Sequence, residues 1–106
     1  MIKVQFTRIN PDKVGRLLAW MDELSTREQE AHETMAADTI THEAAYLLET
    51  SDGPIFVSAM FAQDPEHAER MRFASTHPIA EKYRQVMHDV LVEVLDPKCV
   101  FEAHLE

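Results

Sequence analysis

Two neighbouring segments in the middle of the chain are apolar on both faces of the strands that they would form. Residues 44–48 read AAYLL and residues 55–61 read IFVSAMF, with a turn sequence between them. Side chains alternate between the two faces of a strand, so Tyr46 and Leu48 point away from Leu47. An antiparallel sheet with one solvated face should alternate apolar and polar residues. Both faces of this predicted hairpin therefore need a cover.

The remaining segments predict two more strands and two helices, and each helix has a start signal. Asn10-Pro11 and Asp64-Pro65 each place a capping side chain before a proline that suits the first helical position. Ser75-Thr76-His77-Pro78 should interrupt the second helix. In chain order, the pattern predicts a strand at 2–8, a helix at 11–37, strands at 39–50 and 54–62, a broken helix at 65–96 and a strand at 98–105.

This order is the α+β ferredoxin-like pattern βαββαβ, which places both helices on one face of a four-stranded antiparallel sheet. A chain of 106 residues is expected to form one such domain, spanning residues 1–106. The two predicted helices can cover only one face of the sheet. We therefore expect a homodimer through the open sheet face, which gives a dimeric α/β barrel.

Composition narrows the range of partners and compartments. The formal net charge is −9, whereas nucleic-acid binding needs clustered Lys and Arg to neutralise phosphates. The same charge disfavours docking on anionic membranes. Cys99 is the only cysteine, so the chain has no internal disulfide framework. The N-terminus lacks the apolar run of a signal peptide, and we expect a cytoplasmic protein.

The chain resembles the dimeric α/β-barrel superfamily, which includes antibiotic-biosynthesis monooxygenases, haem-degrading monooxygenases and muconolactone-isomerase-like proteins. More narrowly, it is similar to a small bacterial family of unknown function. The residues that carry the narrower resemblance are Trp20-Met21-Asp22-Glu23-Leu24, Arg27, Glu30, Glu43, Tyr46-Leu47-Leu48-Glu49, Asp64 and Ser75-Thr76-His77-Pro78-Ile79. The sequence departs from that family at Ala80 and Tyr83, where aspartate and histidine are expected. The resemblance implies a pocket between helices and sheet.

Arg27, Glu30 and Glu43 are the first candidates for chemistry. Arg27 lies beside the apolar stripe of the first predicted helix, and Glu30 is within reach one turn later. We expect Arg27 to contact Glu43 between this helix and the sheet. Such a pair can be a structural bridge that fixes register, or a catalytic acid or base tuned by the arginine.

The six histidines show no metal-binding spacing of the HExxH kind, and we expect neither a metal nor another cofactor. His77 precedes Pro78 at the helix break. It is either a helix cap or a third catalytic candidate that titrates near neutral pH. A haem-binding protein is a further alternative, for which His32, His42 or His77 would be the axial ligand.

Trp20, Tyr46 and Tyr83 lie on or beside core-facing stripes, and with Glu30 they are candidate pocket residues. They either pack the core or orient a planar ligand in the pocket that the resemblance implies. Two functions stay open. One is a cofactor-independent monooxygenase or isomerase acting on an aromatic or polyketide-like small molecule. The other is a non-catalytic dimeric protein that binds a small ligand or has a structural role.

Overall fold

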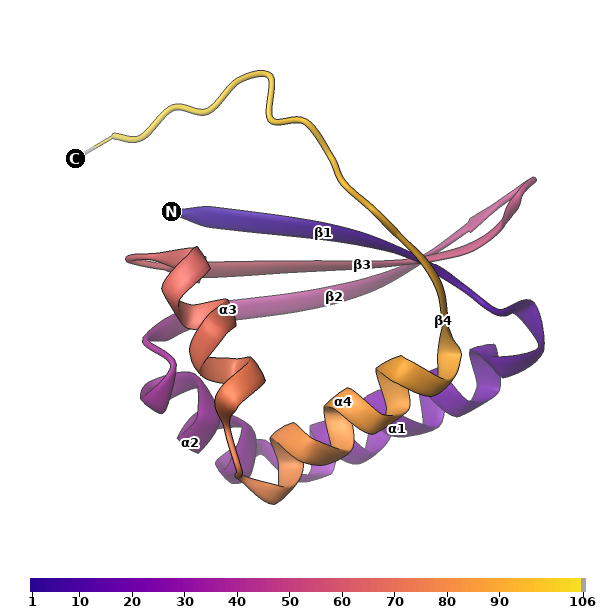
Figure 1. Cartoon of the computed structure of the whole chain (residues 1–106), viewed down its shortest axis with the longest axis horizontal. Helices are drawn as coiled ribbons and strands as arrows, with labels where there is room; N and C mark the ends of the chain where they lie inside the picture. The colour runs from indigo at the N-terminus through magenta and orange to yellow at the C-terminus, as the bar shows by residue number, and fades with distance from the viewer. Residues whose placement is uncertain (106) are drawn as a thin grey trace.

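The computed structural model describes residues 1–105, which form a four-stranded sheet covered by helices on one side (Figure 1). The elements are β1 (Ile2–Ile9), a 3-10 turn η1 (Pro11–Lys13), α1 (Val14–Thr26), α2 (Glu28–Ala37), β2 (Ile40–Thr50), β3 (Gly53–Ala62), α3 (Pro65–Ala74), α4 (Pro78–Val90) and β4 (Leu91–Leu95). The sheet is antiparallel, with strand order β2-β3-β1-β4. The predicted α+β ferredoxin-like fold is confirmed.

The capping residues predicted from the sequence begin the helices. The Asn10 side chain accepts a hydrogen bond from the Asp12 backbone N–H at 2.9 Å and caps the 3-10 turn η1, after which α1 begins without a side-chain cap of its own. Asp64 accepts one from the His67 N–H at 3.1 Å and begins α3. His77 Nδ1 accepts from the Ile79 N–H at 3.2 Å, so His77 caps α4 after the predicted break. Each cap satisfies a backbone donor that the first helical turn leaves without a partner.

The predicted long helix at 11–37 is wrong in one respect, because it divides at Arg27 into α1 and α2. The hydroxyls of Ser25 and Thr26 donate to the carbonyls of Met21 and Glu23, at 3.0 and 2.7 Å. Such bonds compete with the helical backbone ladder. The Arg27 N–H then bonds to the Leu24 carbonyl at 3.0 Å, which closes α1 with a tight turn.

The predicted last strand at 98–105 is also wrong, because the fourth strand is β4 at Leu91–Leu95. The valines at 86, 90 and 94 have helical spacing, but the chain becomes extended at Leu91 and pairs with β1. Four of the five residues of β4 are leucine or valine beside its single glutamate, a composition that fits a strand as well as a helix. Residues 96–105 form neither helix nor strand, and they run along the side of the sheet that carries no helix (Figure 1).

The strand register decides which side chains face the helices. Thr7 of β1 lies opposite Phe56 of β3, and Phe56 lies opposite Leu47 of β2. Phe56 is part of the core, so this row faces the helices. The next residue along, Phe6, lies opposite Val57 on the open face. Lys3, Gln5 and Thr7 of β1 therefore face the helices, whereas Ile2, Val4 and Phe6 face away from them.

The main core lies between α1, α4 and the sheet, and it contains Ile9, Leu17, Trp20, Phe56, Ile79, Val86 and Val90. A smaller cluster under α3 contains Ile40, Ala62 and Ala68. By contrast, the open sheet face exposes large apolar side chains: Ile2 at 41%, Phe61 at 43%, Leu48 at 49% and Tyr46 at 63%. No helix within residues 1–105 is long and apolar enough to span a membrane.

Leu17 and Leu18 of α1 offer a matched test of this core, since Leu17 is fully buried whereas Leu18 is 46% exposed. We expect Leu17→Ala to lower the free energy of unfolding by about 2–5 kcal/mol, because it removes buried methyl groups and leaves a cavity. Leu18→Ala should change it by less than about 1 kcal/mol. Urea denaturation followed by circular dichroism measures both. Equal losses for the two variants would contradict the packing described here.

Candidate functional site

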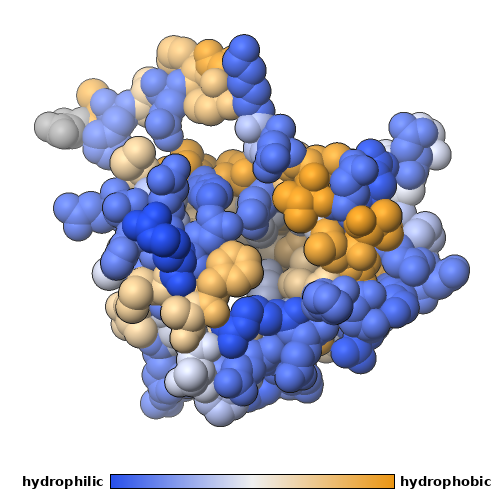
Figure 2. Space-filling model, in the orientation of Figure 1, coloured by the Kyte–Doolittle hydropathy of each residue, from blue (hydrophilic) through white to orange (hydrophobic). Residues whose placement is uncertain are grey.

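A cavity of about 450 Å³ opens between the sheet and the helices α3 and α4. Its walls come from all four strands and from the helices α3 and α4, whereas α1 and α2 contribute none of the lining residues. The apolar part of the wall comprises Phe56, Met60, Phe73, Met87, Leu91 and Val94. Figure 2 shows the surface hollowed between α3 and β4, with apolar side chains bordering the hollow. The volume is in the range of small-molecule sites.

The floor of the cavity is polar because β1 turns its polar side chains toward the helices. Lys3 forms an ion pair with Glu69 of α3, and Gln5 Nε2 donates to Glu69 Oε1 at 3.3 Å. Thr7 continues the same row and is buried. These contacts give the charged groups partners in a site that is partly shielded from water, where an unpaired charge would be costly.

Arg72 of α3 is the centre of the polar wall. Its two terminal nitrogens bind both carboxylate oxygens of Glu43 from β2, with Nη2 to Oε2 at 3.1 Å. Its Nε donates to Asp38 Oδ2 at 3.4 Å, and Asp38 is only 2% exposed. Burial raises the pKa of Asp38 above its ordinary value, although Arg72 acts in the opposite direction. Burial is the largest single influence on Arg72 and opposes its charge, but the hydrogen bond to Glu43 and the negative charges nearby together outweigh it, so the pKa of Arg72 is raised.

Tyr83 of α4 lies in the wall beside this pair of charges. Its ring packs edge-on against Trp20, with centroids 6.3 Å apart and an interplanar angle of 76°. Burial raises the pKa of Tyr83 to about 12, and the charge of Glu43 adds to that shift. The phenol therefore keeps its proton at neutral pH. It can donate a hydrogen bond to a ligand, but it is poorly suited to act as a base.

A second cavity of about 180 Å³ lies between the sheet and the helices α1, α2 and α4. The two cavities share Glu43, Ser58, Arg72, Ala80 and Tyr83 in their walls. The Arg72–Glu43 ion pair and Tyr83 thus stand where the two spaces meet. A ligand in either cavity would contact the same polar groups.

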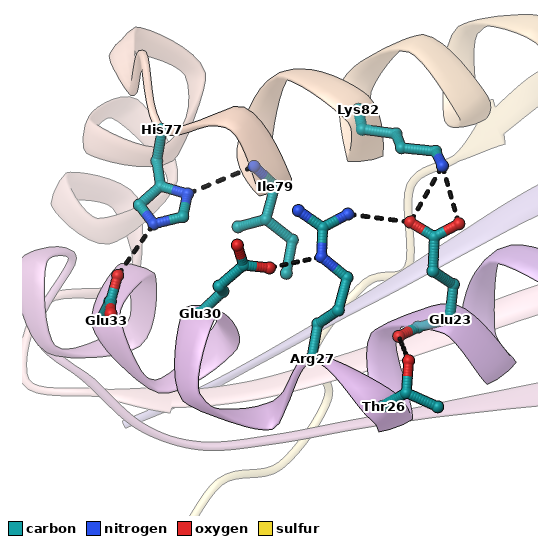
Figure 3. Close-up of polar contacts among 8 residues, drawn as sticks. All are labelled: Glu23, Thr26, Arg27, Glu30, Glu33, His77, Ile79 and Lys82. Atoms are coloured by element: carbon teal, nitrogen blue, oxygen red, sulfur yellow. Dashed lines mark hydrogen bonds and ion pairs between the residues drawn. The ribbon is translucent and has the colours of Figure 1, made fainter.

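Arg27 and Glu43 do not form the ion pair that the sequence predicted. The structure pairs Arg27 with Glu23 at 2.8 Å and with its other predicted neighbour, Glu30, whereas Glu43 binds Arg72. The reason is the break at Arg27, which orients this side chain toward α1 and α4 (Figure 3). Lys82 of α4 binds the same Glu23 at 2.7 Å. These residues therefore form a surface network that joins helices and lie outside both cavity walls.

The other predicted site residues are distributed over three places. His77 caps α4 and its Nε2 lies 3.0 Å from Glu33 of α2, at the helix surface (Figure 3). Trp20 is 2% exposed and belongs to the core behind Tyr83. Tyr46 is on the open face of the sheet. Of the predicted residues, Glu43 and Tyr83 line the cavities, and their roles stay predictions.

Arg72, Arg84 and Glu69 are the cavity residues that sequence reasoning missed, together with the polar side of β1. The sequence contains a signal for the polar side of β1, because Lys3, Gln5 and Thr7 share one strand face. Alternation alone leaves open which face meets the helices. Within residues 1–105, no three His, Cys, Asp or Glu side chains lie close enough together to hold a metal ion.

Tyr83 should ionise near pH 12, whereas an ordinary tyrosine ionises near 10. The raised pKa means that the neutral form persists to higher pH, since burial penalises the phenolate. Alkaline titration of tyrosinate absorbance measures this, and subtracting the curve of Tyr83→Phe isolates Tyr83. A difference curve with its midpoint near 10, in protein that circular dichroism shows to be folded, would contradict the buried position.

Comparison with solved structures supports the fold. The chain is similar to tetracenomycin F2 cyclase from Streptomyces glaucescens, a type II polyketide cyclase, with a TM-score of 0.54 and 15% identity over 99% of this chain and 86% of the other. It is also similar to Rv0793 from Mycobacterium tuberculosis, with a TM-score of 0.53 and 22% identity over 97% and 96% of the chains.

A third similar structure, from Bacteroides thetaiotaomicron, carries the name antibiotic biosynthesis monooxygenase. Its TM-score is 0.57, with 14% identity over 100% of this chain and 94% of the other. None of the curated proteins compared with the chain matches it. At these identities, the structural likeness establishes the fold alone. A family model matches residues 2–105, which confirms the narrower resemblance, and the chain belongs to the family of unknown function DUF6176.

Proposed function

We propose that the protein is a cofactor-independent enzyme, a monooxygenase or isomerase, that acts on a small aromatic or polyketide-like molecule in the 450 Å³ cavity. The observation that carries the proposal is the position of a neutral Tyr83 phenol beside Arg72 and Glu43 in a cavity that also has an apolar wall. The names of two structurally similar proteins, a polyketide cyclase and an antibiotic biosynthesis monooxygenase, agree with this choice of substrate class.

The three groups suit a reaction that begins with removal of a proton from a phenol, an enol or a carbon beside a carbonyl. Tyr83 would donate a hydrogen bond to the substrate oxygen, and Arg72 would stabilise the negative charge that develops there. Glu43 is the carboxylate nearest to this pair and would accept the proton. The apolar wall would hold the planar part of the substrate.

A non-catalytic binding protein is the second candidate, and one observation favours it. Both oxygens of Glu43 are engaged by Arg72, so neither can accept a proton from a substrate without giving up a contact with the arginine. In that case the same cavity would bind an aromatic molecule without changing it.

Anthrone is a suitable probe because its ring system is planar and apolar and its carbonyl activates a methylene group. Monooxygenation would consume one O₂ and produce anthraquinone and water, which an oxygen electrode and absorbance both follow. We expect turnover above the buffer rate and a loss of about tenfold or more in Tyr83→Phe, since one hydrogen bond to the developing anion is removed. Tyr46→Phe, on the open sheet face, should retain the activity.

Binding of anthrone without turnover would favour the binding protein over the enzyme. Isothermal titration calorimetry on the same samples measures that binding. Absence of both binding and turnover would contradict the use of this cavity for aromatic molecules.

We also propose that two copies associate through the open sheet face. The apolar rows of β1, β2 and β3 lie there without a covering helix, and Tyr46, Leu48 and Phe61 are each more than 40% exposed. A stable interface of standard size buries about 800 Å² per partner. The apolar surface removed from water is the driving force.

Leu48→Asp and Leu18→Asp form a matched pair, because both leucines are nearly half exposed on opposite sides of the molecule. We expect sedimentation velocity to give the wild type a mass of twice the 12.2 kDa chain. Leu48→Asp should shift the protein to monomer, since a charge in an apolar interface is costly. Leu18→Asp should remain dimeric. A wild-type monomer at micromolar concentration would contradict the proposal.

A further inference from the structure

We infer that the substrate or ligand of the 450 Å³ cavity carries a carboxylate, and that Arg84 of α4 binds it. The inference rests on the proposed use of this cavity and adds the chemical class of the molecule. Its basis is that Arg84 is a cation in the cavity wall for which the residues 1–105 supply no carboxylate partner.

The other charges of the cavity wall are matched. Lys3 is paired with Glu69, and Arg72 is paired with Glu43. Arg84 is the remaining charged side chain of the wall, apart from the ionisable His88 one turn further along α4. Among the side chains that line the cavity, the arginines and the lysine therefore outnumber the carboxylates by one; Asp38, which also contacts Arg72, lies outside this wall.

Arg84 is also held in position before any ligand arrives. Its Nη1 donates to the Arg72 carbonyl at 2.8 Å, and its Nη2 donates to the Ser75 carbonyl at 2.7 Å. Both carbonyls lie at the C-terminal end of α3, where helix geometry leaves acceptors without their usual partners; that of Arg72 also accepts from the Ser75 N–H at 3.2 Å. These bonds use two of the five guanidinium N–H groups and leave donors for a ligand.

The number of charges favours a carboxylate over a phosphate. One excess cation matches a single negative charge, and a planar guanidinium fits the two oxygens of a carboxylate. The rest of the wall around it is mostly apolar, including Phe73, Met87 and Leu91. The ligand that fits is thus an apolar, aromatic body with one acidic group at the α3–α4 end of the cavity.

The two aromatic probes 2-naphthoate and 2-naphthamide test this, since they have nearly the same shape and differ in charge. We expect wild-type protein to bind the acid about tenfold or more tightly than the amide in calorimetry, as a charge-assisted hydrogen bond would give. The net negative charge of the chain would by itself disfavour the acid. Such a preference would therefore come from a local cation.

Arg84→Gln should abolish the preference for the acid while changing the affinity for the amide by less than about threefold. Arg70→Gln, an exposed arginine of α3 outside the cavity wall, is the matched control and should bind both probes as the wild type does. If Arg84 only holds the end of α3, Arg84→Gln will lose stability and both probes will weaken equally, which overturns the inference. Should that variant fail to fold, Arg84→Lys keeps the charge and should retain part of the preference.

The outcomes separate this inference from the proposed function. Binding of the amide with no preference for the acid would overturn the carboxylate assignment alone and leave an aromatic-binding cavity. Failure of both probes to bind would contradict the proposed use of the cavity as well. Added salt should weaken the binding of 2-naphthoate to wild-type protein and leave the binding of 2-naphthamide unchanged. Binding of 2-naphthoate that does not depend on salt would also overturn the role of Arg84.

Discussion

The pairing of β1 with β3 is the constraint on which the rest of the structure depends. With Thr7 opposite the buried Phe56, every second residue of β1 must face the helices. A shift of one residue would exchange the two faces of the strand. In the observed register, Lys3 and Gln5 lie beneath the helices and Phe6 lies on the open face. A polar cavity floor and an uncovered apolar surface are thus two consequences of one set of hydrogen bonds.

Charged groups on a partly buried face need partners, and the helices supply them. Glu69 and Arg72 of α3 receive Lys3 and Glu43 from the sheet. Buried ion pairs contribute little net stability because desolvation offsets their attraction, yet removing one partner is costly. The pairs therefore constrain where α3 lies more than they stabilise the fold. These pairs hold α3 at a distance from the sheet, and the cavity lies in the space between them.

Sequence reasoning succeeded where the signal was local. Proline after Asn10, Asp64 and His77 marks helix starts, and capping needs only residues within one turn. It failed where two local patterns competed. Valines at 86, 90 and 94 fit a helix, but Leu91 begins a strand because β1 offers hydrogen bonds along its edge. The break at Arg27 depends on hydroxyl bonds of Ser25 and Thr26 that periodicity does not register.

The sequence by itself determined the order of the strands and helices and the apolar character of both faces of the central hairpin. Of the residues that it proposed for a site, Glu43 and Tyr83 line the cavities, whereas Arg27, Trp20 and Tyr46 do not. Only the tertiary structure decided the partner of Glu43, because sequence spacing does not show which helix brings an arginine to β2, and α3 places Arg72 there. It also decided that the polar side of β1 lies inward. The alternating pattern shows that a strand has two unlike faces, but it does not show which face the helices cover. The packing of α3 and α4 against the sheet decides this.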